Sequence, residues 1–177
     1  MTQTVTDLLS ILTIVAQISV IFLIISLVVS RTTKKPNVVT EFIKDNALLL
    51  AFVTALFSMT GSLFFSDFAG FEPCVLCWYQ RILMYPQVLI LGLALWKKEA
   101  SLELVSMIMS ALGVILAAYH YLGQVAVISN LPCAAIGYSS SCSQRFFMEY
   151  GYITIPMMSL SAFALILTVL LVKKLSK

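Results

Sequence analysis

The sequence predicts an all-α membrane protein with five transmembrane helices, and two observations carry this prediction. First, 60% of the 177 residues are hydrophobic and only 11% are charged, whereas a soluble domain has about 25% charged residues. Second, the chain contains five apolar runs of about 20 residues, the length at which a helix crosses the roughly 30 Å hydrocarbon core. A membrane β-barrel would need short segments of alternating hydrophobicity instead.

The five runs follow one another along the whole chain. The first, residues 8–29, lacks the basic start and the small-residue cleavage site of a signal peptide, so we expect a retained helix. The other four runs are residues 47–65, 78–96, 104–123 and 152–172. The expected connections are a polar linker at 32–46, a loop at 66–77, a tight turn at 97–103 and a long loop at 124–151.

Positive charge predicts the orientation of the chain. Nine of the 11 Lys and Arg residues fall in connections that share one side of the membrane: Arg31, Lys34, Lys35, Lys44, Lys97, Lys98, Lys173, Lys174 and Lys177. Arg81 and Arg145 lie at the opposite face. Because basic residues concentrate on the cytoplasmic side, we expect the N-terminus outside and the C-terminus in the cytoplasm.

All four cysteines are expected on the extracytoplasmic side, where disulfides persist. Cys74 and Cys77 form a C-x-x-C pair, and Cys133 and Cys142 lie in the long loop. A disulfide could brace the second pair's loop by about 2–3 kcal/mol, but the first pair closes too small a loop to gain in this way. A zinc site would need four free thiolates in an oxidising compartment, and its second pair would be unusually wide. These points favour redox chemistry at the first pair and predict no metal.

The stretch FEPCVLCWYQR, residues 71–81, suggests how such chemistry is supported. Pro73 suits a turn, and a helix starting near Cys77 would direct its positive dipole end at a thiolate there. Arg81 lies four residues later, on the same helical face one turn deeper, where its charge could stabilise an anion, whereas Glu72 opposes this effect. An arginine at this depth is a functional hypothesis, although snorkelling to the interface is an equal alternative.

His120 strengthens the functional interpretation, because we expect it at a depth similar to that of Arg81. Together they could donate hydrogen bonds to a carbonyl-bearing cofactor such as a lipid-soluble quinone. Trp78 and Tyr79 fit an interfacial aromatic belt, and a place beside a planar ligand is a second possibility.

These residues carry a resemblance to a known family. Residues 74–81, CVLCWYQR, resemble the C-x-x-C-x-x-x-R segment of the DsbB family of disulfide bond formation proteins. The runs WYQRILMYP (78–86), YHYL (119–122) and YITIPMMSL (152–160) resemble its BdbC branch from Gram-positive bacteria. The resemblance covers about 47–172 and implies a four-helix bundle as redox core at 47–177. A cytoplasmic linker at 31–46 and an extra N-terminal transmembrane helix at 1–30 would precede this core.

The resemblance also implies a function in the bacterial plasma membrane. The family passes electrons from an extracytoplasmic thioredoxin-fold oxidoreductase, DsbA- or BdbD-like, to ubiquinone or menaquinone. By position, Cys133 would form the mixed disulfide with the partner, and Cys142 would resolve it and pass electrons to Cys74. The Cys77 thiolate would contact the quinone, supported by Arg81 and with His120 nearby.

The sequence departs from the best-known family members, which have four transmembrane helices and a wider second cysteine pair. Three other functions stay open. A non-enzymatic scaffold would hold two structural disulfides. A vitamin-K-epoxide-reductase-like enzyme would place its loop pair before the C-x-x-C, the reverse of the order here. A transporter or channel subunit often carries an acidic relay in its helices, and none of the five runs has one.

Overall fold

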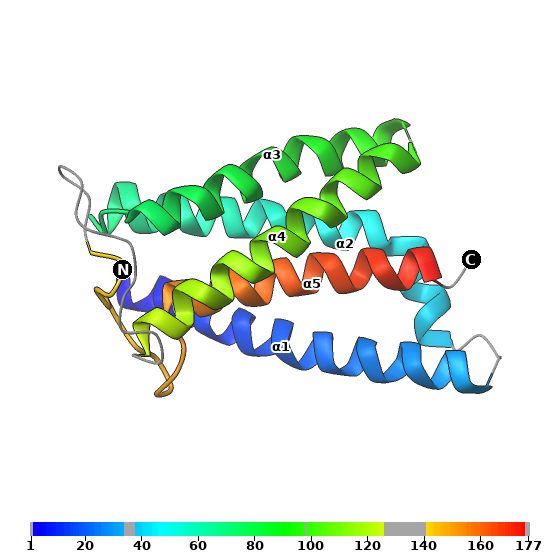
Figure 1. Cartoon of the computed structure of the whole chain (residues 1–177), viewed down its shortest axis with the longest axis horizontal. Helices are drawn as coiled ribbons and strands as arrows, with labels where there is room; N and C mark the ends of the chain where they lie inside the picture. The colour runs from blue at the N-terminus through cyan, green and yellow to red at the C-terminus, as the bar shows by residue number, and fades with distance from the viewer. Residues whose placement is uncertain (1, 34–37, 98, 126–140, 176–177) are drawn as a thin grey trace.

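A computed structural model describes residues 2–33, 38–97, 99–125 and 141–175. It confirms an all-α chain, with five α-helices that pass back and forth along one long axis (Figure 1). They are α1 (Thr2–Thr33), α2 (Val38–Leu63), α3 (Val75–Lys97), α4 (Ala100–Gln124) and α5 (Ile155–Leu175). A short π-helix, η1 (Phe64–Phe68), extends α2.

Four of the helices, α1, α2 with η1, α4 and α5, are long and apolar enough to cross a membrane. The fifth, α3, has a comparable length of 23 residues but carries Gln80, Arg81 and Gln87, which make it less apolar. Gln87 is fully buried, and its Oε1 accepts hydrogen bonds of 2.9 Å from the hydroxyls of Ser106 and Ser110 on α4. Because these contacts satisfy its polar group inside the bundle, α3 takes its place beside α4.

Most of the expected polar linker at 32–46 is helical, because α1 continues to Thr33 and α2 already begins at Val38. Ile43 and Ala47 lie four residues apart, on one face of α2. They pack with Leu23 of α1 and Val169 of α5 in a small apolar cluster. Tertiary contacts therefore extend the helix into a stretch whose composition alone looked like a connection.

The centre of the bundle is α5, which packs against α1, α2 and α4. Phe163 of α5 is fully buried and lies against Gly113 of α4, where an added Cβ would approach the phenyl ring to 2.4 Å. Gly113 is therefore required by the close approach of the two helices, as is common where helices pack in membranes.

The N-terminus lies at the same end of the bundle as the α2–α3 connection and residues 141–154, and the C-terminus lies at the other end (Figure 1). Basic residues occupy the last turns of α1, α3 and α5, namely Arg31, Lys97, Lys173 and Lys174. These turns lie at the end opposite the N-terminus. The bundle thus has one basic end and one end that carries the described cysteines.

Candidate functional site

The C-x-x-C pair spans the start of α3. Cys74 is the last residue of the connection before the helix, and Cys77 lies in its first turn. Both are free thiols, and their Sγ atoms are 2.9 Å apart. The backbone N–H of Cys77 donates to Cys74 Sγ over 3.3 Å. The pair is therefore arranged for disulfide formation at a helix N-terminus, where a thiolate is favoured.

His120 of α4 joins this pair to the segment around Cys142, which precedes α5. The side chain is 1% exposed, and its Nε2 lies 3.7 Å from Cys74 Sγ and 3.1 Å from the carbonyl oxygen of Cys142. Because a carbonyl only accepts hydrogen bonds, Nε2 carries the hydrogen, and Nδ1 accepts from the side-chain amide of Gln80 at 2.9 Å. The imidazole is thus held as one neutral tautomer, with its N–H beside a sulfur.

These contacts favour an anionic sulfur at Cys74. The hydrogen bond from the Cys77 thiol lowers the pKa of the Cys74 thiol from 9.0 to about 4, against the opposing effect of burial. A hydrogen bond from His120 lowers this pKa further. The sequence argument expected the stabilised thiolate at Cys77 from the helix dipole and Arg81, whereas in this dithiol the donors gather around Cys74.

Arg81 is held by α2 rather than by an acidic residue. Its Nε and Nη2 donate to the hydroxyl and the carbonyl of Ser62, each over 3.1 Å. The guanidinium carbon lies 5.3 Å from the centroid of the Trp78 ring and 6.0 Å from that of Tyr85, so two aromatic faces help to stabilise the charge. Within the described part of the chain, Nη1 has no hydrogen-bond partner and remains able to donate to a ligand.

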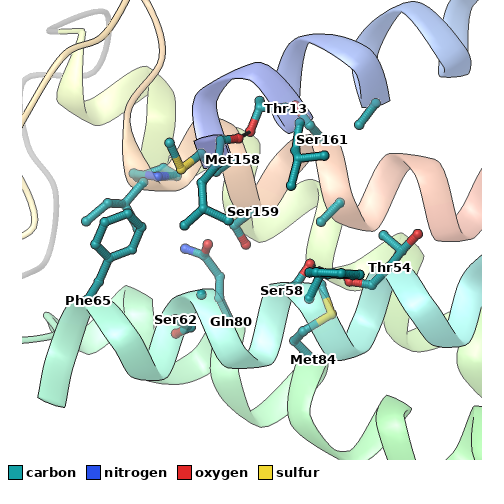
Figure 2. Close-up of a pocket in the computed structure, with 18 of the residues that line it drawn as sticks. Thr13, Thr54, Ser58, Ser62, Phe65, Gln80, Met84, Met158, Ser159 and Ser161 are labelled. Carbon is teal, nitrogen blue, oxygen red and sulfur yellow. Dashed lines mark hydrogen bonds between the residues drawn. The ribbon is translucent and has the colours of Figure 1, made fainter. Parts of the chain in front are cut away.

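A cavity of about 510 Å³ begins beside this arginine, and we call it the central cavity. Its walls come from α1, α2, α3 and α5, with His120 of α4 and Phe65 of η1 at the cysteine end. Figure 2 shows Gln80 and Met84 of α3 beside Ser58 and Ser62 of α2, with Met158 and Ser159 of α5 opposite them. The volume lies in the range of small-molecule sites, and a mostly apolar wall with a few polar groups is typical of them.

The two cysteines of the pair face different neighbours. Cys77, Arg81 and His120 line the central cavity. Cys74 does not line the cavity and is buried in a cluster with Leu76 and Cys142, against which Cys77 also packs. One sulfur is therefore presented to the cavity and the other to the segment around Cys142.

The remaining predicted site residues have different positions. Trp78 and Tyr79 are each 52% exposed, and neither lines the central cavity, although Trp78 contacts Arg81. Cys142 is buried and disulfide-bonded. Cys133 lies outside the described residues, so its predicted role stays a prediction.

Aromatic stacking holds the connection before α3 and the segment before α5 together. The ring of Phe71, before α3, stacks on that of Phe146 with centroids 4.7 Å apart, and it also stacks on Phe65 at 5.8 Å. Arg145 Nε donates to the carbonyl of Gln124 over 2.8 Å, which ties the segment before α5 to the end of α4. These contacts hold the chain around Cys142 close to the C-x-x-C pair.

Sequence reasoning missed three contributors to the site: Gln80, Ser62 and the wall formed by α1. Gln80 is 6% exposed and orients His120. A signal for it existed, because a glutamine one turn after Cys77 in an apolar run must find a partner. Ser62 gave no such signal, since serines are common in membrane helices and usually bond to their own backbone.

Cys74, Cys77 and His120 also offer three donor atoms within 4.8 Å of one another, close enough to hold a metal ion. Metal binding there would have to replace the hydrogen bond from His120 Nε2 to the Cys142 carbonyl. The prediction of no metal therefore remains a prediction that the hydrogen bonding favours.

Comparison with known proteins identifies a family for this chain. The family model for disulfide bond formation protein DsbB matches residues 44–173. The chain belongs to the DsbB family. This confirms the resemblance seen in the sequence, and it makes the chain a membrane disulfide formation protein. The DsbB match begins inside α2, so α1 lies outside it.

Individual disulfide formation proteins of Bacillales are also similar to this chain in sequence. A probable disulfide formation protein of Oceanobacillus iheyensis is 44% identical over 123 residues, which cover 69% of this chain and 84% of that protein. Disulfide bond formation protein C of Bacillus subtilis is 43% identical over 122 residues, 68% of this chain and 86% of that protein. An SPbeta prophage-derived disulfide bond formation protein B of the same species is 41% identical over 127 residues, 72% and 84% of the two chains. No solved structure matches the chain significantly.

Proposed function

We propose that this protein is a membrane thiol:quinone oxidoreductase that reoxidises an extracytoplasmic thioredoxin-fold disulfide donor of the DsbA or BdbD type. The observation that carries this proposal is the division of the C-x-x-C pair. Cys77 borders the central cavity together with Arg81, whereas Cys74 packs against Cys142. An electron relay needs one sulfur of the pair beside the quinone cavity and the other beside the second cysteine pair, whereas a purely structural disulfide needs neither.

On the partner side, the residues support two thiol–disulfide exchanges. A thiolate of the reduced partner attacks Cys133, and the partner's second thiol then releases it as a disulfide, leaving Cys133 and Cys142 reduced. The Cys142 thiolate then attacks an oxidised Cys74–Cys77 pair at Cys74. Completion of this exchange restores the Cys133–Cys142 disulfide and leaves Cys74 and Cys77 as the dithiol. His120 lies between the two pairs and can donate its Nε2 hydrogen to the sulfur that leaves.

On the membrane side, the residues fit a quinone. The central cavity is mostly apolar, and its polar residues offer donors that a planar dicarbonyl needs, namely Arg81 Nη1 and the second amide hydrogen of Gln80. A bound quinone would accept two electrons and two protons while Cys74 and Cys77 close to a disulfide. Arg81 would hold the developing negative charge on an oxygen, because its Ser62 contacts fix the guanidinium in place.

The topology completes the proposal. We place the N-terminus and the cysteines outside and the C-terminus in the cytoplasm of a bacterial plasma membrane, because the basic ends of α1, α3 and α5 lie together. Residues 47–177 would form the redox core, with residues 1–30 as an added helix.

A direct assay tests the function. The purified protein is supplied with a reduced thioredoxin-fold partner and a quinone, and the quinone's ultraviolet absorbance is followed with the thiol content of the partner. We expect one partner disulfide for each quinone reduced, and complete loss of turnover in Cys77→Ala. Tyr79→Phe, at a half-exposed position outside the cavity, serves as the control. Absence of cysteine-dependent turnover with both quinone classes and several partners would favour the scaffold.

A further inference from the structure

The helix that lies outside the family match forms one wall of the central cavity. Six residues of α1 line it: Leu9, Leu12, Thr13, Val15, Ala16 and Ser19. Most of them recur at intervals of three and four, so they form one continuous face of the helix. In Figure 2, Thr13 of α1 lies with Ser161 of α5 across the cavity from Ser58 and Thr54 of α2.

Specific contacts fix α1 in this position. Gln17 donates from Nε2 to the hydroxyl of Ser161 over 3.0 Å and accepts from the phenol of Tyr152 over 2.9 Å. Nearer the cysteine end, Leu9 packs over Gly61 of α2, where an added Cβ would lie 3.2 Å from the leucine. The helix is therefore a built part of the cavity wall.

The boundary between α1 and α2 is open where it lines the cavity. Leu12 and Val15 of α1 are 42% and 53% exposed, and Phe57 of α2 is 58% exposed, although all three line the cavity. We call this boundary, with Leu50 and Val53 of α2, the α1–α2 seam. The seam belongs to two helices that can cross a membrane, so its exposed apolar side chains connect the cavity lining to the surface that lipid would cover.

We propose that the α1–α2 seam binds the isoprenoid tail of the quinone and that α1 thereby sets the preference for long-tailed quinones. The inference rests on the proposed function. The occupant follows from continuity: the cavity lining includes Arg81 and Gln80, which suit a carbonyl headgroup, and it continues to the exposed apolar residues of the α1–α2 seam. A linear hydrocarbon attached to a polar ring fits both parts of this lining at once.

Ala16→Phe tests the seam, because a phenyl ring on the lining face of α1 fills the path of the tail. Val15→Phe, at the exposed lip of the seam, is a second variant that folding tolerates more easily. Ile18→Phe is the matched control, since Ile18 is 61% exposed and does not line the cavity. Binding is measured at equilibrium by quenching of tryptophan fluorescence, with a long-tailed menaquinone and a tail-less naphthoquinone, alongside turnover of both.

We expect Ala16→Phe to weaken binding of the long-tailed quinone about tenfold or more and Val15→Phe to weaken it less. The tail-less quinone should bind all variants within about twofold of the wild type. Equal binding of the long-tailed quinone by Ala16→Phe and Ile18→Phe would overturn the inference. So would a co-purified phospholipid that Ala16→Phe releases without any change in quinone binding. A wild-type protein that neither binds nor reduces either quinone would instead refute the proposed function, which is a distinct result.

Discussion

The ionisation of Cys74 provides the sharpest test of the site, because one contact dominates it. The hydrogen bond from the Cys77 thiol is the largest cause of the lowered pKa, which is about 4 compared with 9.0 for an ordinary cysteine. At pH 6, a thiol with the ordinary value is only about 0.1% ionised, whereas Cys74 in the dithiol should be about 99% thiolate. The difference corresponds to about a thousandfold more nucleophile at a mildly acidic pH.

The sign of the effect fixes the pH window. Because the pKa of Cys74 is lower in the folded than in the unfolded protein, ionisation of Cys74 stabilises the folded, reduced protein. This stabilisation is complete above pH 9.0 and is lost as the pH falls through about 4. Ultraviolet thiolate absorbance measures the ionisation directly in the reduced Cys133→Ser/Cys142→Ser protein, where only the C-x-x-C pair titrates. We expect about one thiolate to persist from pH 8 down to pH 5 and to disappear near pH 4.

Two substitutions test whether the Cys77 thiol causes the lowered pKa of Cys74. Adding Cys77→Ala removes the largest cause and leaves burial opposed by the hydrogen bonds from His120 and from the backbone N–H of residue 77, so the pKa of the remaining thiol should rise towards its ordinary value. Cys77→Ser keeps a hydroxyl donor and should retain part of the depression. The reasoning is refuted if the unsubstituted pair titrates near 9.0, or if Cys77→Ala leaves the titration where it was.

Two further predictions follow from the packing and from the arginine. Gly113→Ala should destabilise the protein by about 1–3 kcal/mol in detergent, since the new methyl would overlap the buried Phe163 ring. Gly92→Ala is its control, because the added Cβ would meet its neighbour at an ordinary 3.4 Å, and equal melting temperatures for the two variants would contradict this account. Arg81→Lys should weaken quinone binding about 10–100-fold, since lysine cannot hold both Ser62 oxygens and still present a fixed donor. Ser62→Ala, which keeps the carbonyl contact, should have a smaller effect on the measured Kd, and a larger effect than that of Arg81→Lys would contradict the proposed role of the arginine.

The sequence was sufficient to predict the helices and the family, whereas the predicted chemistry of the site stays a prediction. Long uncharged runs indicate membrane helices because lipid cannot satisfy an open backbone, and the described residues form five α-helices at these runs. Arg81 and His120 were expected at one depth, and both line the central cavity. Depth is predictable from a position along a helix, since the rise per residue is fixed.

Rotation of each helix about its axis was not predictable in the same way. In a soluble protein the apolar face indicates the core, but a membrane helix is apolar on the lipid side as well. The sequence therefore could not show that Ser62 faces Arg81, that Trp78 and Tyr79 face outward, or that one face of α1 lines the cavity. These facts depend on how neighbouring helices pack, which no single run of residues records.

The stacked rings of Phe71 and Phe146 have a kinetic consequence for the proposed relay. By keeping the segment around Cys142 beside the C-x-x-C pair, they make the transfer between the two pairs a first-order event with a high effective concentration. The rate of this internal transfer should then be independent of the partner's concentration. A stacked aromatic pair contributes about 0.5–1.5 kcal/mol. Loosening the stack should therefore slow the internal transfer and leave the bimolecular encounter with the partner unchanged.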